Sequence, residues 1–149
     1  SRIAPILQDI VIRLKNGSDI GKLKKVDLYW LIEDRNYFEW FTKMLKEMDE
    51  DGSPKFFNYH IYFLERSPEE ISRKMMYIST DVLESETNID LVDNLWSKSS
   101  FGIPDWEKIF SKLGGNSNQK VFYSGPNKHS RKLKKACKKS GIQFKQGNF

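Results

Sequence analysis

The chain has 149 residues, of which 38% are hydrophobic and 13% aromatic, and this composition favours one globular α/β domain over a disordered or fibrous chain. The sequence contains no apolar run near the roughly 20 residues that a membrane-spanning helix needs. Its single cysteine, Cys137, excludes an internal disulfide framework and fits a reducing compartment, and neither histidine (His60, His129) lies at metal-ligand spacing from it. The formal net charge of +5 raises the question of an anionic partner.

Apolar periodicity and turn residues predict strands that alternate with helices along the chain. In chain order we expect a helix over 3–14, a strand over 26–32, a helix over 36–48, a strand over 59–64, a helix over 67–80, a loop with one short helical piece over 81–104, a helix over 105–113, a strand over 121–124, a helix over 127–139 and a strand over 142–145. This alternation predicts one α/β domain over residues 1–149, with a doubly wound, mainly parallel sheet flanked by helices.

In such folds ligands bind at the carboxyl ends of the strands. Ser124-Gly125-Pro126 follows the strand over 121–124, where glycine lets the backbone approach a ligand and Asn127 is expected to cap the next helix. The same three residues are equally typical of an ordinary strand-to-helix turn that binds no ligand. Glu33 or Asp34, after the first strand, could hold ribose hydroxyls. These patterns alone indicate an α/β domain with a nucleotide or phosphate site.

The positive charge is concentrated on the helix over 127–139. Its cations alternate with Leu133, Ala136 and Cys137 at helical spacing, and they are Lys128, Arg131, Lys132, Lys134, Lys135, Lys138 and Lys139. The simplest interpretation is a solvated face. We expect no nucleic-acid partner, because no module with stacking aromatics accompanies these cations. Weak contact with an anionic membrane surface, or with an anionic cofactor, stays open.

Four stretches, LYWLIEDRNYFEWF, FGIPDW, VFYSGP and the terminal GNF, occur in an order and at a spacing that resemble the C-terminal NAD-binding part of the NADPH oxidases. The branch with the dual oxidases and calcium-regulated oxidases is the most similar, and RIAPILQDIVIRL resembles the family's first helix. The resemblance implies a ferredoxin-reductase-like NAD(P)-binding domain that passes hydride from NADPH or NADH to FAD, for transmembrane electron transfer to oxygen and production of superoxide or hydrogen peroxide.

The same resemblance implies a module at the cytosolic face of a membrane, as the C-terminal part of a larger oxidase. Its partners would be FAD-binding and haem-containing membrane domains of the parent protein, and FAD would be bound mainly by a domain absent from this chain. Because the family's first strand and glycine-rich loop precede the position that matches Ser1, we expect the sheet to lack its first strand.

The resemblance also assigns site residues. Ser124 and Phe149 take the catalytic positions, since the Ser124-Gly125-Pro126 loop would face the nicotinamide and Phe149 would cover the flavin ring. The cofactor-binding residues that it implies are Ser1, Glu33, Asp34, Arg35, Ile103, Pro104, Ser124, Gly125, Pro126, Asn148 and Phe149.

Several of these positions depart from the family pattern. Glu33 and Ile103 stand where the family has arginines, Ser124 where it has cysteine, Gly147 where it has glutamate, and Ser1-Arg2 where it has Thr-Pro. An acid at Glu33 favours NADH over NADPH, unless Arg35 compensates for the 2′-phosphate. The alternative hypothesis is a degenerate, non-catalytic module that serves as an assembly or regulatory surface.

Overall fold

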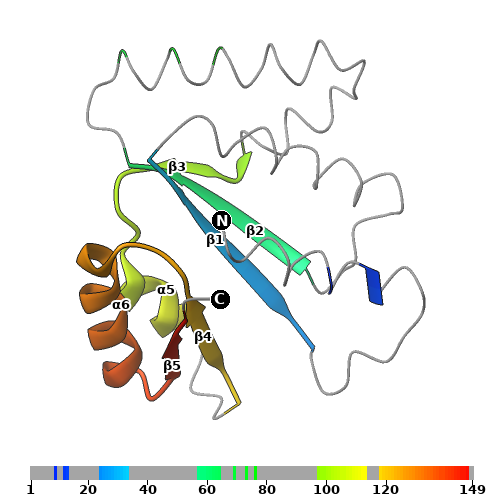
Figure 1. The fold of residues 1–149 in the computed structure, drawn as a ribbon, viewed down its shortest axis with the longest axis vertical. Coiled ribbons are helices and arrows are strands. Elements are labelled where there is room, and N and C mark those ends of the chain that lie inside the picture. The colour runs from blue at the N-terminus through cyan, green and yellow to red at the C-terminus, as the bar shows by residue number, and fades with distance from the viewer. Residues whose placement is uncertain are drawn as a thin grey trace. The chain divides into compact units, whose positions relative to one another are not determined.

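The computed structural model describes residues 24–33, 57–64, 97–113 and 118–147, with the single positions Asp9, Ile12, Arg13, Glu69, Arg73 and Met76. The elements in these ranges are β1 (Val26–Ile32), β2 (Phe57–Phe63), β3 (Ser99–Phe101), α5 (Trp106–Lys112), β4 (Lys120–Tyr123), α6 (Asn127–Lys139) and β5 (Gln143–Gln146) (Figure 1). They fall into two compact units, one within Gln8–Ile103 and the other including Pro104–Phe149. We call these the first and second unit and describe each by itself.

The first unit contains a parallel sheet in the order β1-β2-β3. β1 and β2 pair along their whole length, from Val26 opposite Phe57 to Ile32 opposite Phe63 (Figure 1). Both strands are rich in aromatic and β-branched residues, which suit a pleated surface. One face of the pair is buried and apolar, and it comprises Leu28, Trp30, Ile32, Tyr59, Ile61 and Phe63. The other face is half-buried and mixed, so successive side chains along each strand alternate between a buried apolar face and a more exposed one.

The expectation of a loop with a short helical piece over 81–104 is wrong for residues 99–101, which form the strand β3. The backbone of Ile61 donates to Lys98 at 2.9 Å, and Gly102 donates to Phe63 at 2.8 Å, so the segment between them forms an edge strand. A three-residue strand of sequence Ser-Ser-Phe has no periodicity to detect. Pairing with β2, and not local sequence, therefore determines this strand.

The second unit contains the helices α5 and α6 and a two-stranded parallel sheet formed by β4 and β5. α6 connects the two strands and packs against α5 and β5. The apolar core of the unit consists of Trp106, Phe110, Tyr123, Leu133, Ala136, Cys137 and Ile142. Leu133, Ala136 and Cys137 recur at helical spacing, and they fix which face of α6 is turned inward.

The two described helices begin differently. Asp105 precedes α5, and its Oδ1 accepts a hydrogen bond from the backbone of Lys108 at 3.2 Å. α6 begins after Pro126, which has extended dihedrals and no side-chain capping bond. The expectation that Asn127 caps α6 is therefore wrong. Asn127 is already the first helical residue, and its side-chain oxygen accepts a hydrogen bond from Gln146.

The predicted parallel α/β architecture is confirmed, but the described strands form two sheets instead of one. The doubly wound topology and the absence of a first strand stay predictions, as does a single domain over residues 1–149. The strand over 26–32 and the helix over 127–139 have the predicted limits, and the other described elements except β3 agree within two residues. The six single positions are all helical, as expected within 3–14 and 67–80. The predicted helix over 36–48 lies outside the described residues.

Candidate nucleotide-binding site

The carboxyl ends of β1, β2 and β3 form one edge of the first unit's sheet. Leu64 donates to the carbonyl of Ile32 at 3.1 Å, and the Gly102 bond to Phe63 holds the end of β3 beside β2. Glu33, directly after β1, and Ile103, two residues after β3, both lie at this edge. The strands that carry them are two inter-strand spacings apart, or about 10 Å.

This edge is not cationic over the residues that the structure describes. Glu33 is exposed, and Ile103 is 52% exposed, where the resemblance implied cofactor contacts. Phe101 is 51% exposed, with its ring 5.8 Å from that of Phe63. A carboxylate can accept hydrogen bonds from ribose hydroxyls, but neither it nor an isoleucine can neutralise a phosphate. The described side chains after β1 and β3 at this edge can therefore accept hydrogen bonds but carry no positive charge.

The loop at the carboxyl end of β4 is closed by a hydrogen bond from Tyr123. The Tyr123 hydroxyl donates to the carbonyl of Pro126 at 2.8 Å, which folds the loop back over the tyrosine ring. Gly125 has a φ of 155°, and a Cβ there would lie 2.8 Å from the Tyr123 hydroxyl oxygen. Only glycine fits this position without a shift, so the loop keeps its backbone accessible. Ser124 is half-buried, while Gly125 and Pro126 are exposed.

The end of β5 is tied to the same loop. Gly147 donates to the carbonyl of Tyr123 at 3.1 Å, and the Gln146 side chain donates to Asn127 Oδ1 at 2.7 Å. Tyr123, Asn127 and Gln146 thus support the Ser124–Pro126 loop, a role that sequence reasoning did not find. The available signal was a tyrosine two residues before a glycine at a strand end, which does not specify a closed loop by itself.

The structure locates only part of the predicted site. Glu33 and Ile103 lie at one edge of the first unit. Ser124, Gly125 and Pro126 form one loop of the second unit, in which Pro104 is buried. The remaining predicted site residues lie outside the described residues, and they are Ser1, Asp34, Arg35, Asn148 and Phe149. Their roles stay predictions.

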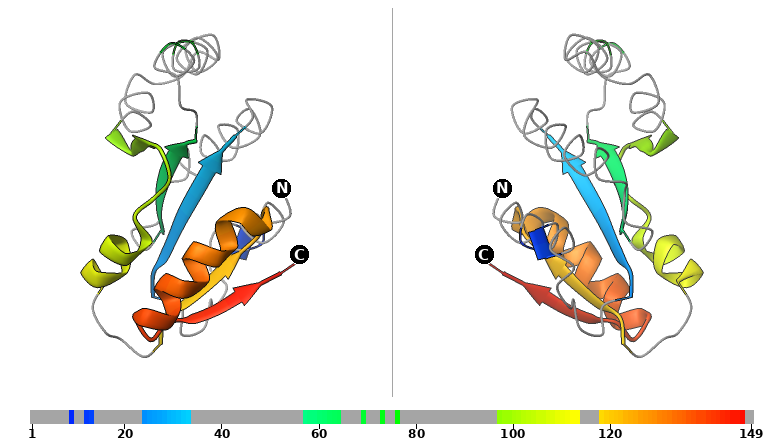
Figure 2. Two further views of the ribbon diagram at one scale, coloured as in Figure 1. Left: turned by 90° about the vertical axis from the view of Figure 1, so that its left-hand side faces the viewer. Right: turned by 90° about the vertical axis from the view of Figure 1, so that its right-hand side faces the viewer.

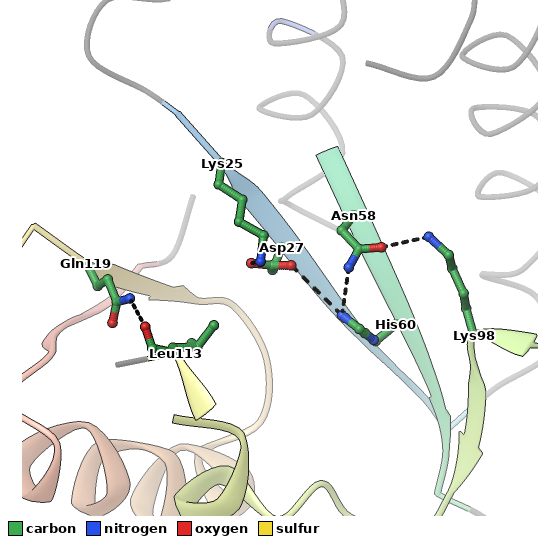
Figure 3. Close-up of polar contacts among 7 residues, drawn as sticks. All are labelled: Lys25, Asp27, Asn58, His60, Lys98, Leu113 and Gln119. Carbon is green, nitrogen blue, oxygen red and sulfur yellow. Dashed lines mark hydrogen bonds and ion pairs between the residues drawn. The ribbon is translucent and has the colours of Figure 1, made fainter. Parts of the chain in front are cut away.

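A polar cluster that the sequence analysis did not predict lies near the amino ends of β1 and β2 (Figure 3). Asp27 pairs with Lys25 at 3.1 Å and lies 3.9 Å from Nε2 of His60. Asn58 contacts His60 at 3.4 Å and accepts a hydrogen bond from the Lys98 ammonium at 2.6 Å. Asp27 precedes Glu33 by six positions, or about 20 Å along an extended strand, so this cluster lies at the other end of β1 from Glu33.

Burial shifts two pKa values in and beside this cluster. It lowers the pKa of His60 below its ordinary value of 6.5, with Lys98 and Lys25 acting in the same direction and Asp27 opposing them. It raises the pKa of Tyr29 to about 12, with smaller contributions from Asp27 and Tyr62. The Tyr29 and His60 rings stack with centroids 4.6 Å apart. A neutral imidazole and a neutral phenol are therefore the favoured forms here at neutral pH.

Two further findings concern what the described part of the chain can hold. No group of three or more His, Cys, Asp or Glu residues there is arranged to bind a metal ion. No helix there is long and apolar enough to cross a membrane.

In the second unit, Gln119 donates to the carbonyl of Leu113 at 3.2 Å and links the end of α5 to the start of β4 (Figure 3).

Parallel strands with accessible loops at their carboxyl ends form an α/β arrangement in which ligands bind at those ends. The sequence pattern of the ferric reductase NAD-binding domain matches residues 1–138, and the chain belongs to that family.

The relatives of the chain include several NADPH oxidases. NADPH oxidase 5 of Homo sapiens is 29% identical over 144 residues, and NADPH oxidase 3 of Homo sapiens is 30% identical over 141 residues. These alignments cover 91% and 90% of this chain but 19% and 24% of the relatives. Dual oxidase 2 of Rattus norvegicus is 28% identical over 139 residues, with 90% of this chain and 9% of the relative covered. The chain is thus a distant homologue of the NADPH oxidases and spans a quarter or less of the length of these relatives.

Proposed function

We propose that the chain is the NAD(P)H-binding dehydrogenase module of an NADPH oxidase-like protein. The observation that carries this proposal is the accessible Gly125 loop at the carboxyl end of β4, in a chain whose family match covers residues 1–138. Bound nicotinamide would supply a hydride for FAD, and the flavin would pass electrons across a membrane to oxygen.

Each described site residue has a role in this proposal. Gly125 lets the nicotinamide approach the backbone, while the half-buried Ser124 presents a hydroxyl to it. Tyr123 and Gln146 hold the loop in shape before the ligand arrives, which reduces the ordering cost of binding. Phe149 would cover the flavin ring until nicotinamide displaces it. FAD-binding and haem-containing domains would be the partners, with the module at the cytosolic face of a membrane.

The first-unit edge argues for NADH as at least an equal substrate. The exposed Glu33 follows β1, and a carboxylate there accepts ribose hydroxyls but repels a 2′-phosphate. Ile103 offers no charge to either nucleotide. A compensating role for Arg35 would restore NADPH binding, and the experiment below decides between these outcomes.

The test is a calorimetric titration of NADH and NADPH into the chain and its variants at fixed ionic strength. We expect the unaltered chain to bind NADH at least as tightly as NADPH. Glu33→Arg should shift the ratio toward NADPH by about tenfold or more, because it replaces a repulsion with a charge-assisted hydrogen bond. Glu33→Gln is the matched control, since it removes the repulsion without adding a cation. NADPH binding tighter than NADH binding by the unaltered chain would overturn the assignment of Glu33.

A second candidate function is a non-catalytic assembly or regulatory surface. The exposed side chains of Phe101 and Ile103 favour it, since apolar residues at a strand end suit contact with a protein. Failure of both nucleotides to bind the unaltered chain, Glu33→Arg and Ile103→Arg would support this candidate and remove the dehydrogenase proposal.

A further inference from the structure

Charge is distributed very unevenly along the chain. Residues 104–149 contain eleven Lys and Arg and two Asp and Glu, a net charge of +9. Residues 1–103 contain fourteen Lys and Arg and eighteen Asp and Glu, a net charge of −4. The overall charge of +5 therefore conceals a strongly cationic C-terminal third.

Within that third, α6 presents its cations on a single outward face. All seven Lys and Arg side chains of the helix are exposed, and α6 contains no acidic residue. Lys139 pairs with Glu107 of α5 at 3.0 Å, and Glu107 and Asp105 are the two acids of this third. So many like charges on a thirteen-residue helix repel one another, and an anionic partner would relieve that repulsion.

The orientation of this face is set by the core of the second unit. Leu133, Ala136 and Cys137 are at most 3% exposed, so α6 cannot rotate its cations inward without losing its buried stripe. The helix runs beside the β4–β5 sheet, as both side views show (Figure 2). Its length of about 20 Å makes the face a continuous cationic stripe.

We propose that the exposed face of α6 binds an anionic phospholipid surface. Six of its seven cations are lysines, whose ammonium groups are compact, strongly hydrated point charges, and such charges suit a diffuse layer of headgroups. Specific protein interfaces are depleted in lysine, and single-stranded nucleic acids need stacking aromatics, of which α6 has none. This inference concerns a surface apart from the nucleotide site and does not depend on the proposed function.

The mode of binding follows from what α6 lacks. The outward face carries no apolar or aromatic side chain that could insert below the headgroups. Attraction is therefore purely electrostatic, and salt should release the protein. Each lysine near an anionic surface contributes about a fivefold gain in affinity, so loss of three lysines should weaken binding roughly 100-fold.

The experiment measures cosedimentation of the full chain with vesicles of equal parts phosphatidylserine and phosphatidylcholine, and with vesicles of phosphatidylcholine alone. We expect binding to the anionic vesicles only, with release at high salt. A triple variant with Lys134→Gln, Lys135→Gln and Lys138→Gln should bind the anionic vesicles roughly 100-fold more weakly. The matched control removes three exposed lysines of the same unit outside α6, and it carries Lys108→Gln, Lys112→Gln and Lys120→Gln.

The control distinguishes a localised surface from net charge. Retention of most vesicle binding by the control supports the proposal, and equal loss in the two triple variants overturns it. Absence of binding to anionic vesicles at low salt also overturns it and leaves α6 as a solvated face. Salt-sensitive binding to polyglutamate or to single-stranded RNA without vesicle binding would assign the face to a different partner. Circular dichroism checks that each triple variant is folded.

Discussion

At the scale of single residues, Tyr123 and Gly125 show how one side chain determines which residue its neighbour can be. The Tyr123 hydroxyl occupies the space where a Cβ of residue 125 would lie, and it holds the Pro126 carbonyl at 2.8 Å. The loop is therefore shaped by a contact between residues two and three positions apart. This loop is the part of the proposed nucleotide site that the structure describes most fully.

Gly125→Ala should destabilise the chain by about 1–3 kcal/mol, because the added methyl group overlaps the Tyr123 hydroxyl. Urea unfolding measures the change. The same substitution in a Tyr123→Phe background should cost less, since the overlapping oxygen is gone. Gly102→Ala is the control, because Gly102 has a φ of 84° but open space around it. A cost for Gly125→Ala no greater than that for Gly102→Ala would contradict the steric explanation.

His60 should make the stability of the chain depend on pH below about 7. Its folded pKa lies below the unfolded value of 6.5, so the unfolded state binds a proton first as the pH falls. The free energy of unfolding should therefore be fully maintained above 6.5 and decrease as the pH falls toward the folded pKa. Urea unfolding from pH 7.5 to pH 5 measures this decrease.

His60→Phe is the matched variant for that measurement, since it retains a ring against Tyr29 but cannot titrate. The free energy of unfolding of this variant should decrease less between pH 7.5 and pH 5 than that of the unaltered chain. An equal decrease in the two proteins would assign the pH dependence to other groups.

At the scale of elements, α5 depends on the residue that precedes it. It has seven residues, too few to be stable in isolation, and Asp105 satisfies one of its unpaired amide groups at 3.2 Å. Trp106 and Phe110 anchor its buried side. The helix is thus maintained by a cap at its start and by two aromatic rings in the core.

Asp105→Ala should lower the free energy of unfolding by about 1 kcal/mol, because the Lys108 amide loses its acceptor. Asp105→Asn keeps a hydrogen-bond acceptor and should lower the free energy of unfolding by only about 0.3 kcal/mol. Denaturant unfolding of the three proteins in the same buffer gives both values. If alanine and asparagine cost the same, charge at this position matters and the capping hydrogen bond does not.

At the scale of the whole molecule, each unit contains its own apolar core. Leu28, Trp30, Ile32, Tyr59, Ile61 and Phe63 form one, and the residues around Leu133 and Cys137 form the other. A cavity in one core should therefore weaken mainly the unit that contains it. Cys137 reports on the second unit, because its side chain is 0% exposed and burial raises its pKa to about 11.

The rate at which a thiol reagent modifies Cys137 under native conditions should increase strongly in Leu133→Ala and only slightly in Ile61→Ala. Both substitutions remove buried aliphatic groups and should cost about 2–5 kcal/mol. The first opens the core that shields the thiol, while the second opens the other core. Equal acceleration by the two variants would show that the units unfold together.

The sequence by itself determined the elements whose patterns are local. β1 has the expected limits because apolar and aromatic residues dominate its sequence, with an unbroken run from Leu28 to Ile32. α6 has them because Leu133, Ala136 and Cys137 recur at helical spacing between lysines. The parallel pairing of β4 and β5 could be expected because a helix lies between them in the sequence. Parallel strands need such a crossover, whereas antiparallel neighbours can be joined by a tight turn. The family also followed from short motifs, which are local by definition.

Tertiary structure alone decided the features that depend on residues distant in the chain. β3 exists because β2 offers it a free edge, and the Asp27–His60 cluster exists because the β1–β2 register sets Tyr29 opposite His60. Tyr123 closes its loop because the backbone turns back over its ring, and Gln146 reaches Asn127 across nineteen positions. Such contacts depend on distance in space, which no local pattern of residues encodes. A sequence pattern therefore predicts which segments form strands and helices, and packing decides which side chains meet.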